Sequence, residues 1–502
     1  MTGKTGAAPP GPSLTIAYRW YALGLLALIN LLNYLDRNVI FALFEPIKRD
    51  LGLTDTQLGW LGSAYILVFS VAALPFGVIS DLRSRRAVIA AGVTVWSAFT
   101  ALGAAVRNFG QLFICRAAVG IGEAAFGPAA ASLVADYFPG KGRAAAMGIL
   151  SSGIALGGVL GIGLGGVLEK HYGWRVAFLV VGIPGMLCAV AAARLVDPTR
   201  RPSTVTLREF FAGRDGAVAM LRRDFPCTMI GVALGLGTAI ALGGVYDSKL
   251  DIAVLGAAVG LGLAGDILRW VRLIRSGKIG TTPLGGEWGG AIDDIVGAVK
   301  RVLATPTLMY VFVAGAMISF GMNGIVGWGP TFIARELGLT SSQAATLLGK
   351  WGLLAGTAGT LFGGGLADWL RRYTDQARVI TVAIGLLIGA PAAIWLLTVR
   401  DQTIFIPVFF AAFFFLSWYN GPLTAVIFDV VPARVGATVA GAYLLFIHLA
   451  GDAIAFPLVG ALSDRFGIDR AVFVLPSMAL LGGLVVLGAI RTVSADMRRV
   501  TQ

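Results

Sequence analysis

Leu51–Gln57 reads LGLTDTQ, and Leu337–Gln343 reads LGLTSSQ, 286 residues further along the chain. In both segments a threonine and the glutamine three residues later have the spacing of a capping box, which starts a helix. Three further pairs of similar segments follow in the same order, at offsets of 287 to 294 residues: GVISDLRSRR (77–86) and GGLADWLRR (364–372), DYFP (136–139) and DVVP (429–432), and GVLEKHYG (166–173) and GALSDRFG (460–467). Four matches in one register indicate that the chain contains two copies of one unit.

Hydrophobic segments surround these motifs in two sets of six. The first set covers 19–44, 56–81, 86–106, 110–137, 140–168 and 174–196, and the second covers 306–334, 343–367, 378–399, 404–430, 435–462 and 471–491. Only 13% of the 502 residues are charged, against about a quarter in soluble domains, and 57% are hydrophobic. We therefore expect an all-α polytopic membrane protein with two six-helix bundles, 19–197 and 305–491, related by a pseudo-two-fold axis. Transporters of this architecture carry substrate between the halves.

Residues 198–304 separate the two sets. Two further apolar runs, joined by the polar turn YDSKLD, predict an inserted transmembrane hairpin over 226–268, with a peripheral amphipathic arrangement as the alternative. Apolar residues at helical spacing predict an amphipathic helix over 290–304 on the membrane surface.

The net charge of +13 comes from Lys and Arg in short loops between hydrophobic runs, which is the positive-inside pattern and not a nucleic-acid site. That pattern predicts a multi-pass protein of the cell (inner) membrane with both termini in the cytoplasm. Residues 1–18, polar and proline-rich, are expected to form a disordered tail, and 492–502 a second cytoplasmic tail.

Two loops carry a related motif, Gly77-x3-Asp81-x3-Arg85-Arg86 and Gly364-x3-Asp368-x2-Arg371-Arg372. They resemble the signature G-x-x-x-D-R-x-G-R-R/K of the major facilitator superfamily, although Leu82 and Ser84 replace its first arginine and its second glycine. A basic inner loop accounts for the arginines but not for the Gly–Asp spacing. The resemblance implies a cytoplasmic gate at these motif residues, and the next loops are expected to extend it through Asp136, Arg143, Asp429 and Arg434.

Four ionisable residues lie inside membrane spans of the first half: Asp36 and Arg37 in the first span, and Arg116 and Glu123 in the fourth. A charge at the centre of a membrane helix costs about 2.5–3.5 kcal/mol, so two acids and two bases are expected to pair. At about 1.5 Å per residue, Asp36 and Arg116 reach similar depths. We expect these four residues to couple transport to protons. A static ion cluster that only fixes helix packing is the alternative.

Three segments resemble the spinster family of lysolipid and sphingolipid transporters: NYLDR (33–37), RAAVGIGEAAFGPA (116–129) and DYFPGKGRAAAMG (136–148). The resemblance covers both six-helix halves but not the insert, and organic-anion symporters share R-x-x-x-G-x-G-E-like stretches. It implies that Asp36 and Arg37 form a coupling pair with Arg116 and Glu123 as partners, and that the cargo is an amphiphilic lipid.

His448 and Asp452 lie one helical turn apart in the eleventh span. A histidine that titrates near neutrality could assist proton movement, and we expect both residues to take part in proton coupling. A hydrogen bond that only packs the helix is the alternative.

Aromatic and polar residues of spans one, two, four, seven and ten predict a largely apolar lining that suits an amphiphile with an anionic head. The expected substrate-binding residues are Asn33, Tyr34, Arg37, Tyr65, Arg116, Asn323, Trp328, Trp418, Tyr419 and Asn420.

We therefore expect a secondary active transporter that works by alternating access, is proton-coupled and moves a lysolipid or sphingolipid-like amphiphile. A proton-coupled symporter of small organic anions is one alternative, and a passive lipid scramblase or channel, or a membrane-embedded lipid enzyme, is another. With only two histidines and no metal spacing among three cysteines, we expect no catalytic activity, metal or cofactor. The expected partners are the substrate and the bilayer, without nucleic acid, for a monomeric protein.

Overall fold

The computed structural model describes residues 14–82, 84–198 and 301–501, with a few single positions between 226 and 269. Most of the expected hairpin 226–268, of the helix 290–304 and of the N-terminal tail lies outside the described residues. Nearly all the described residues are helical, and none of them lies in a strand. This confirms the all-α class.

The first half contains six long helices and one short amphipathic helix. They are α1 (Ile16–Ala42), α2 (Phe44–Leu51), α3 (Asp55–Leu82), α4 (Arg85–Leu102), α5 (Phe109–Tyr137), α6 (Arg143–Tyr172) and α7 (Trp174–Ala193). Helix α1 packs along α6, and α3 and α4 both pack against α5. Side-chain caps start α1 and α5, since Thr15 accepts from the amide of Tyr18 and Asn108 from that of Gln111.

The second half repeats this arrangement with more interruptions. Its helices are α13 (Pro306–Glu336), α14 (Ser341–Leu370), α15 (Ala377–Leu396), α16 (Gln402–Leu416), α17 (Pro422–Asp429), α18 (Ala433–Ile447), α19 (Ala453–Phe466), α20 (Ile468–Ala471), α21 (Val474–Ile490) and α22 (Val493–Thr501). Helix α13 packs along α21, and α15 contacts both α16 and α21.

All twelve hydrophobic runs coincide with helices. Eleven segments of the described chain are long and apolar enough to cross a membrane. Helix α14 falls outside that set, yet it has 30 residues and packs between the halves against α6 and within its own half against α16. The expected capping boxes are present as well. Thr54 and Gln57 exchange hydrogen bonds of 2.9 and 3.2 Å, and Thr340 and Gln343 form the same box at the start of α14.

Two spans of the second half are broken where the sequence predicts continuous runs. The tenth span stops at a 3₁₀ turn, Ser417–Tyr419, and restarts after Gly421, whose φ of 86° lies in the left-handed region that glycine tolerates. The eleventh widens into one turn of π-helix at His448–Asp452. Such π turns often occur at functional sites.

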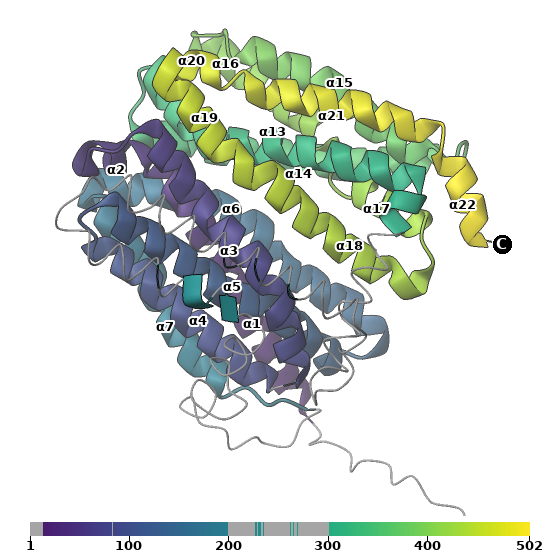
Figure 1. Cartoon of the computed structure of the whole chain (residues 1–502), viewed down its shortest axis with the longest axis horizontal. Coiled ribbons are helices and arrows are strands. Elements are labelled where there is room, and N and C mark those ends of the chain that lie inside the picture. Colours follow the sequence, from purple (N-terminus) through teal and green to yellow (C-terminus); the bar gives the residue numbers. More distant parts are fainter. Residues whose placement is uncertain are drawn as a thin grey trace, which may run out of the picture.

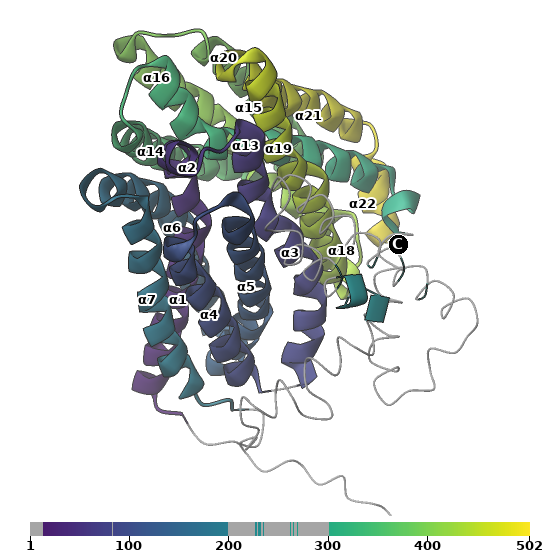
Figure 2. The ribbon, with the colours of Figure 1, turned by 60° about the vertical axis from the view of Figure 1, so that its left-hand side comes forward.

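The two halves meet mainly through α3 with α19 and through α6 with α14. Figure 1 shows their ribbons meeting near α2 and spreading apart toward α22, and Figure 2 shows the same halves after a turn of 60°. We call these two ends of the molecule the α2 end and the α22 end.

Candidate functional site

The four charged residues inside the first half form two buried ion pairs. Nε of Arg37 lies 2.5 Å from Oε2 of Glu123, and Nη1 of Arg116 lies 3.1 Å from Oδ1 of Asp36. Thr100, which the sequence did not single out, donates a hydrogen bond to the other carboxylate oxygen of Asp36. The predicted meeting of Asp36 and Arg116 is thus confirmed. The two pairs together are electrically neutral, which lowers the free-energy cost of burying them.

Several polar atoms in this cluster have no hydrogen-bond partner among the described residues. They are Nε and Nη2 of Arg116 and Oε1 of Glu123, and Nδ2 of Asn33, one turn before Arg37 on α1, is buried and unpartnered as well. Buried polar groups are nearly always satisfied, so each exception requires an explanation. Here the free atoms include one carboxylate oxygen, which can accept a proton, and two guanidinium N–H groups, which can donate to an anion or to water.

Aromatic rings enclose the guanidinium group of Arg37. It lies 4.7 Å from the ring centroid of Tyr34, 5.6 Å from that of Tyr65 and 4.5 Å from that of Phe69. The guanidinium group of Arg116 lies 5.4 Å from the same Tyr65 ring. Tyr65 therefore contacts both arginines. The sequence predicted Tyr34 and Tyr65 here but missed Phe69, one helical turn beyond Tyr65.

The second half contributes a separate polar cluster around the buried carboxylate of Asp452. Oδ1 accepts from Ser319 and, at 3.0 Å, from Nδ2 of Asn323, and Oδ2 lies 2.6 Å from Nδ1 of His448. The predicted His448–Asp452 contact is therefore present. Ser319 was not predicted, although it lies one turn before Asn323 on α13.

Tyr65 lies between the two clusters, at the interface of the halves. Its ring lies 5.6 Å from the guanidinium carbon of Arg37 and 5.4 Å from that of Arg116, and α3, which carries it, contacts the π turn that contains Asp452. The helix that carries Tyr65 is also tied to the second half, since Ser63 Oγ donates to the carbonyl of Ala453 at 2.8 Å. The charges of both halves thus meet in one region.

At the α2 end, ion pairs cross from one half to the other. Arg335 of α13 binds Asp55 through two hydrogen bonds of 2.7 and 2.8 Å and binds Glu45 at 2.7 Å. Lys48 approaches Asp55 at 2.6 Å from the same half. The sequence does not single out Arg335, Glu45 or Lys48.

Backbone contacts reinforce this closure. Asp464 of α19 accepts from the amides of Asp55 and Thr56, each at 2.8 Å, and so caps the first turn of α3. Close packing requires Gly460, because a Cβ there would lie 2.3 Å from the carbonyl oxygen of Asp55. Asp55 and Asp464 both belong to the repeated segments, so the repeat is the sequence signal that could have pointed to these two residues.

A surface pair also occurs at this end. Arg175 of α7 donates to Asp50 of α2, and this hydrogen bond lowers the pKa of the Asp50 carboxyl. Both residues belong to the first half, so the pair does not cross the interface.

At the α22 end, the predicted gate residues pair within their own halves. Arg85 binds Asp197 at 2.5 Å and Asp136 at 2.7 Å. In the second half Asp429 binds Arg371 at 3.1 Å and also contacts Arg378. The sequence missed Asp197 and Arg378.

The other predicted gate residues make fewer or weaker interactions. Arg86 donates to the carbonyl of Leu195 at 3.3 Å, Asp368 lies 3.9 Å from Arg378, and Arg143 and Arg372 are exposed. Nothing lies within 4 Å of a Cβ built on Gly364. The surroundings of Gly77 and the side chains of Asp81 and Arg434 lie outside what the structure describes. The gate role of this set remains a prediction.

Three predicted substrate-binding residues lie away from the two clusters. Trp328 is fully buried and donates to the carbonyl of Phe456 at 3.2 Å. Trp418 packs on Gly363 and Gly385 inside the second half. Asn420 is exposed and bonds Thr360 at 3.3 Å. Tyr419 lies in the 3₁₀ turn Ser417–Tyr419 that interrupts the tenth span.

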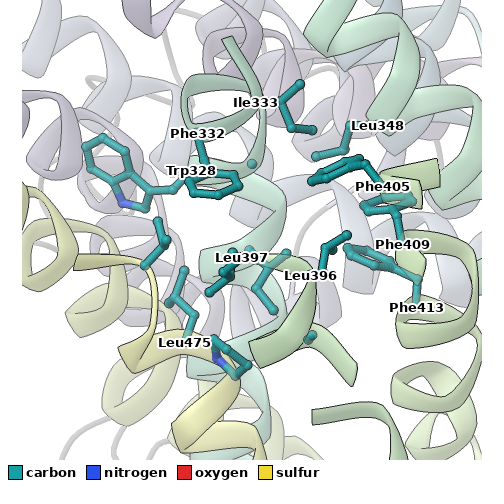
Figure 3. Close-up of a pocket in the computed structure, with 15 residues that line it drawn as sticks. Trp328, Phe332, Ile333, Leu348, Leu396, Leu397, Phe405, Phe409, Phe413 and Leu475 are labelled. Atoms are coloured by element: carbon teal, nitrogen blue, oxygen red, sulfur yellow. The ribbon is translucent and has the colours of Figure 1, made fainter. Parts of the chain in front are cut away.

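An apolar pocket lies inside the second half, next to the α2 end. Figure 3 shows Phe405, Phe409 and Phe413 of α16 on one side of it and Trp328 and Phe332 of α13 on the other. Its volume is about 40 Å³. This is room for a few atoms, so we assign the pocket to imperfect packing and not to a lipid tail.

Most of the chain is similar to known families and proteins. The model of the Major Facilitator Superfamily matches residues 26–451. An MFS-type efflux pump of Mycolicibacterium smegmatis is 25% identical, over 94% of this chain and 91% of its own. The sphingosine-1-phosphate transporter SPNS2 of Xenopus tropicalis is 23% identical, over 94% of this chain and 82% of its own.

The fold also matches a solved structure. A bacterial homologue of the human lysosomal transporter spinster, crystallised in an inward-facing and unoccupied conformation, is 22% identical, with a TM-score of 0.69 over 97% of this chain and 98% of its own. At this identity the likeness shows a shared fold. The family model, however, covers most of the chain. This chain is therefore a member of the Major Facilitator Superfamily of transporters, and it is similar to spinster proteins.

Proposed function

We propose that this protein is a proton-coupled secondary active transporter that moves a lysolipid or sphingolipid-like amphiphile by alternating access. The observation that carries the proposal is the state of Glu123. One of its carboxylate oxygens holds Arg37, and the other is buried without a partner among the described residues. The group can therefore accept a proton without first breaking another contact.

Protonation would couple to substrate binding through the arginines. A carboxylate that gains a proton loses its charge and with it most of its attraction for a guanidinium group. Arg37 would then be free to bind an anionic head group within its enclosure of three aromatic rings. Asp36 stands in the same relation to Arg116, with Thr100 as an additional donor.

The interface of the halves supports alternating access. Ion pairs join the halves at the α2 end, whereas the pairs described at the α22 end stay within one half. If both termini are cytoplasmic, as the distribution of Lys and Arg predicts, the α2 end faces outward and this conformation is inward-open. The opposite state requires that Arg335 release Asp55 and Glu45.

The surroundings of the arginines support an amphiphilic cargo. Tyr34, Tyr65 and Phe69 offer apolar faces next to a cationic group, which suits a molecule with an anionic head and a tail. The similarity to a sphingosine-1-phosphate transporter supports the same class. A small organic anion would use the arginines but not the aromatic faces.

The test is transport of labelled lysophospholipids and sphingosine phosphate in proteoliposomes, with and without a pH gradient. We expect gradient-driven transport by the wild type, and its loss in Glu123→Gln and Asp36→Asn. Asp50→Asn is the matched control, because it makes the same chemical change in an exposed pair outside the cluster.

Two results would contradict the proposal. Gradient-independent transport that survives in both cluster variants would reduce the cluster to a packing element. Transport of small organic anions without any lipid movement would replace the proposed cargo.

A further inference from the structure

We infer that α22 is an interfacial helix that binds the anionic head groups of phospholipids in the leaflet at the α22 end, and that Asp496 ties this helix to the first turn of α13. The surface lies apart from both polar clusters. Its ligand is a lipid of the bilayer and not the cargo.

Helix α22 follows directly on a membrane span and turns away from it. The span α21 ends at Ile490, and α22 starts at Val493. Figure 1 shows α22 bent away from the end of α21, at the C-terminal edge of the molecule. Because only two residues separate α22 from a transmembrane helix, it lies at the level where the lipid head groups begin.

The inner face of α22 packs on the second half. Val493 is 1% exposed and belongs to the hydrophobic core, and Met497, one turn later, packs against the same core. Asp496 lies on this face as well, and its side chain is only 3% exposed. The helix is thus fixed to the protein by one face and presents its other face outward.

Asp496 caps α13 from a distant part of the chain. Its Oδ2 accepts from the amide of Thr307 at 3.1 Å and from the hydroxyl of the same residue at 2.7 Å. Thr305, at the N-cap position of α13, makes no side-chain cap hydrogen bond, and the first amides of a helix have no acceptor within it. The Thr307 amide therefore depends on α22 for its partner, so a change in α22 reaches the first turn of α13 through this carboxylate.

The outer face of α22 is basic. Arg491, Arg498 and Arg499 are exposed, and their spacing of seven and eight residues places them on one side of the helix, together with the exposed Ala495. Asp496 is the one acidic residue of α22 and is buried. Arg499 reaches it with Nη1 at 3.1 Å, yet 69% of the arginine side chain stays exposed. The outer face therefore offers cations without an exposed acid beside them.

Charge and position together determine the class of ligand. A basic helix face at the level of the head groups attracts anionic phospholipids, and each arginine near such a surface strengthens binding about fivefold. Guanidinium groups also suit phosphate oxygens, which they bind through paired hydrogen bonds. A soluble acidic partner would match the charge alone, whereas lipid phosphates match both the charge and the attachment of α22 to a span.

Hydrogen exchange, followed by mass spectrometry on the full-length protein in lipid nanodiscs, tests both parts of the inference. One set of discs contains phosphatidylcholine, and the other adds phosphatidylglycerol with the same acyl chains. The first variant, Arg491→Gln/Arg498→Gln, leaves Arg499 in place. The matched control, Lys170→Gln/Arg470→Gln, removes the same charge from exposed positions at the α2 end.

We expect phosphatidylglycerol to slow the exchange of α22 and of the Thr307 amide at least about fivefold in the wild type, which is the effect of one arginine at an anionic surface. Arg491→Gln/Arg498→Gln should lose most of this slowing in both segments, and the control should keep it. Both variants change exposed side chains only, so we expect them to fold as the wild type does.

Three results would overturn the inference. Equal exchange of α22 in the two kinds of disc would exclude the lipid surface and favour a soluble acidic partner. Slower exchange of α22 without a change at Thr307 would exclude the coupling through Asp496. A slowing that both variants lose equally would be an effect of the net charge of the protein and not of α22.

Discussion

The two ends of the molecule use the same kinds of charged residue in opposite ways. At the α2 end, Arg335 of the second half binds Asp55 and Glu45 of the first. At the α22 end, Arg85 binds Asp136 and Asp197 within the first half, and Asp429 binds two arginines within the second. An ion pair across the interface stabilises closure of that end, while a pair within a half stabilises only the half. The conformation therefore depends on which ion pairs cross the interface between the two halves.

The largest expected effect comes from Arg335→Gln. This change leaves Asp55 and Glu45 without their shared guanidinium group, and breaking a buried pair by removing one partner costs about 3–5 kcal/mol. Asp55 keeps Lys48 as a counter-ion, so we expect the lower part of that range, or about a hundredfold shift of the population toward separation at the α2 end. The rate of maleimide labelling of a cysteine at Thr56 measures the shift. An unchanged rate would show that these ion pairs do not hold the end closed.

A smaller effect is expected from Gly460→Ala. The new Cβ would meet the carbonyl oxygen of Asp55 at 2.3 Å, so α3 and α19 must move apart. Overpacking of this kind costs about 1–3 kcal/mol. The same labelling assay should show a five- to hundredfold rise, roughly as this energy requires. Gly441→Ala is the control, since nothing lies within 4 Å of its Cβ. Equal rates in the two variants would contradict the assigned close approach.

Asp429→Asn sharpens the comparison from the other end. Its pairs with Arg371 and Arg378 stay within the second half. We expect a loss of about 1 kcal/mol or less in thermal stability, as for partly exposed pairs, and less than a twofold change in labelling at the α2 end. A large rise in labelling would mean that the two ends communicate through this pair.

The smallest expected effect comes from Ala393→Val, which changes no ion pair at either end. Ala393 lines the apolar pocket of about 40 Å³. Filling part of this volume should stabilise the protein by less than about 1 kcal/mol, given about 24 cal/mol per Å³ of cavity. A rise of a few degrees in the melting temperature in detergent is the readout, with transport unchanged. A fall in the melting temperature would show that the pocket has no room for the two methyl groups that valine adds.

Much of the fold could be predicted from the sequence because hydrophobic length and repetition are local signals. The twelve spans and both capping boxes follow from them. The breaks at Ser417–Tyr419 and His448–Asp452 could not be predicted in this way, since each lies inside one uninterrupted hydrophobic run. At the second break Gly451 packs closely on α13, where a Cβ would lie 2.6 Å from the carbonyl oxygen of Ala316, and this contact depends on the tertiary structure.

The residues of the site also divide into those that the sequence predicts and those that it does not. Burial of charge predicted that Asp36, Arg37, Arg116 and Glu123 would pair, and depth along the helices predicted the meeting of Asp36 with Arg116. The depth of a residue along its helix says nothing about its partners in the other half. Arg335 therefore read as an ordinary basic residue near a helix end, and its binding to Asp55 emerged only from the way the halves come together.

The most direct test of alternating access measures both ends at once. Spin labels replace exposed residues in each half, at Lys170 and Arg470 for the α2 end and at Arg143 and Arg372 for the α22 end. Distances are recorded in lipid nanodiscs at acid and alkaline pH, with and without lysolipid, for the wild type and Glu123→Gln. We predict that pH and lysolipid change the two distances in opposite directions, so that the α2-end distance lengthens when the α22-end distance shortens. The distances in the Glu123→Gln variant should no longer respond to pH. Distances that change together at both ends, or a variant that responds to pH as the wild type does, would contradict the account.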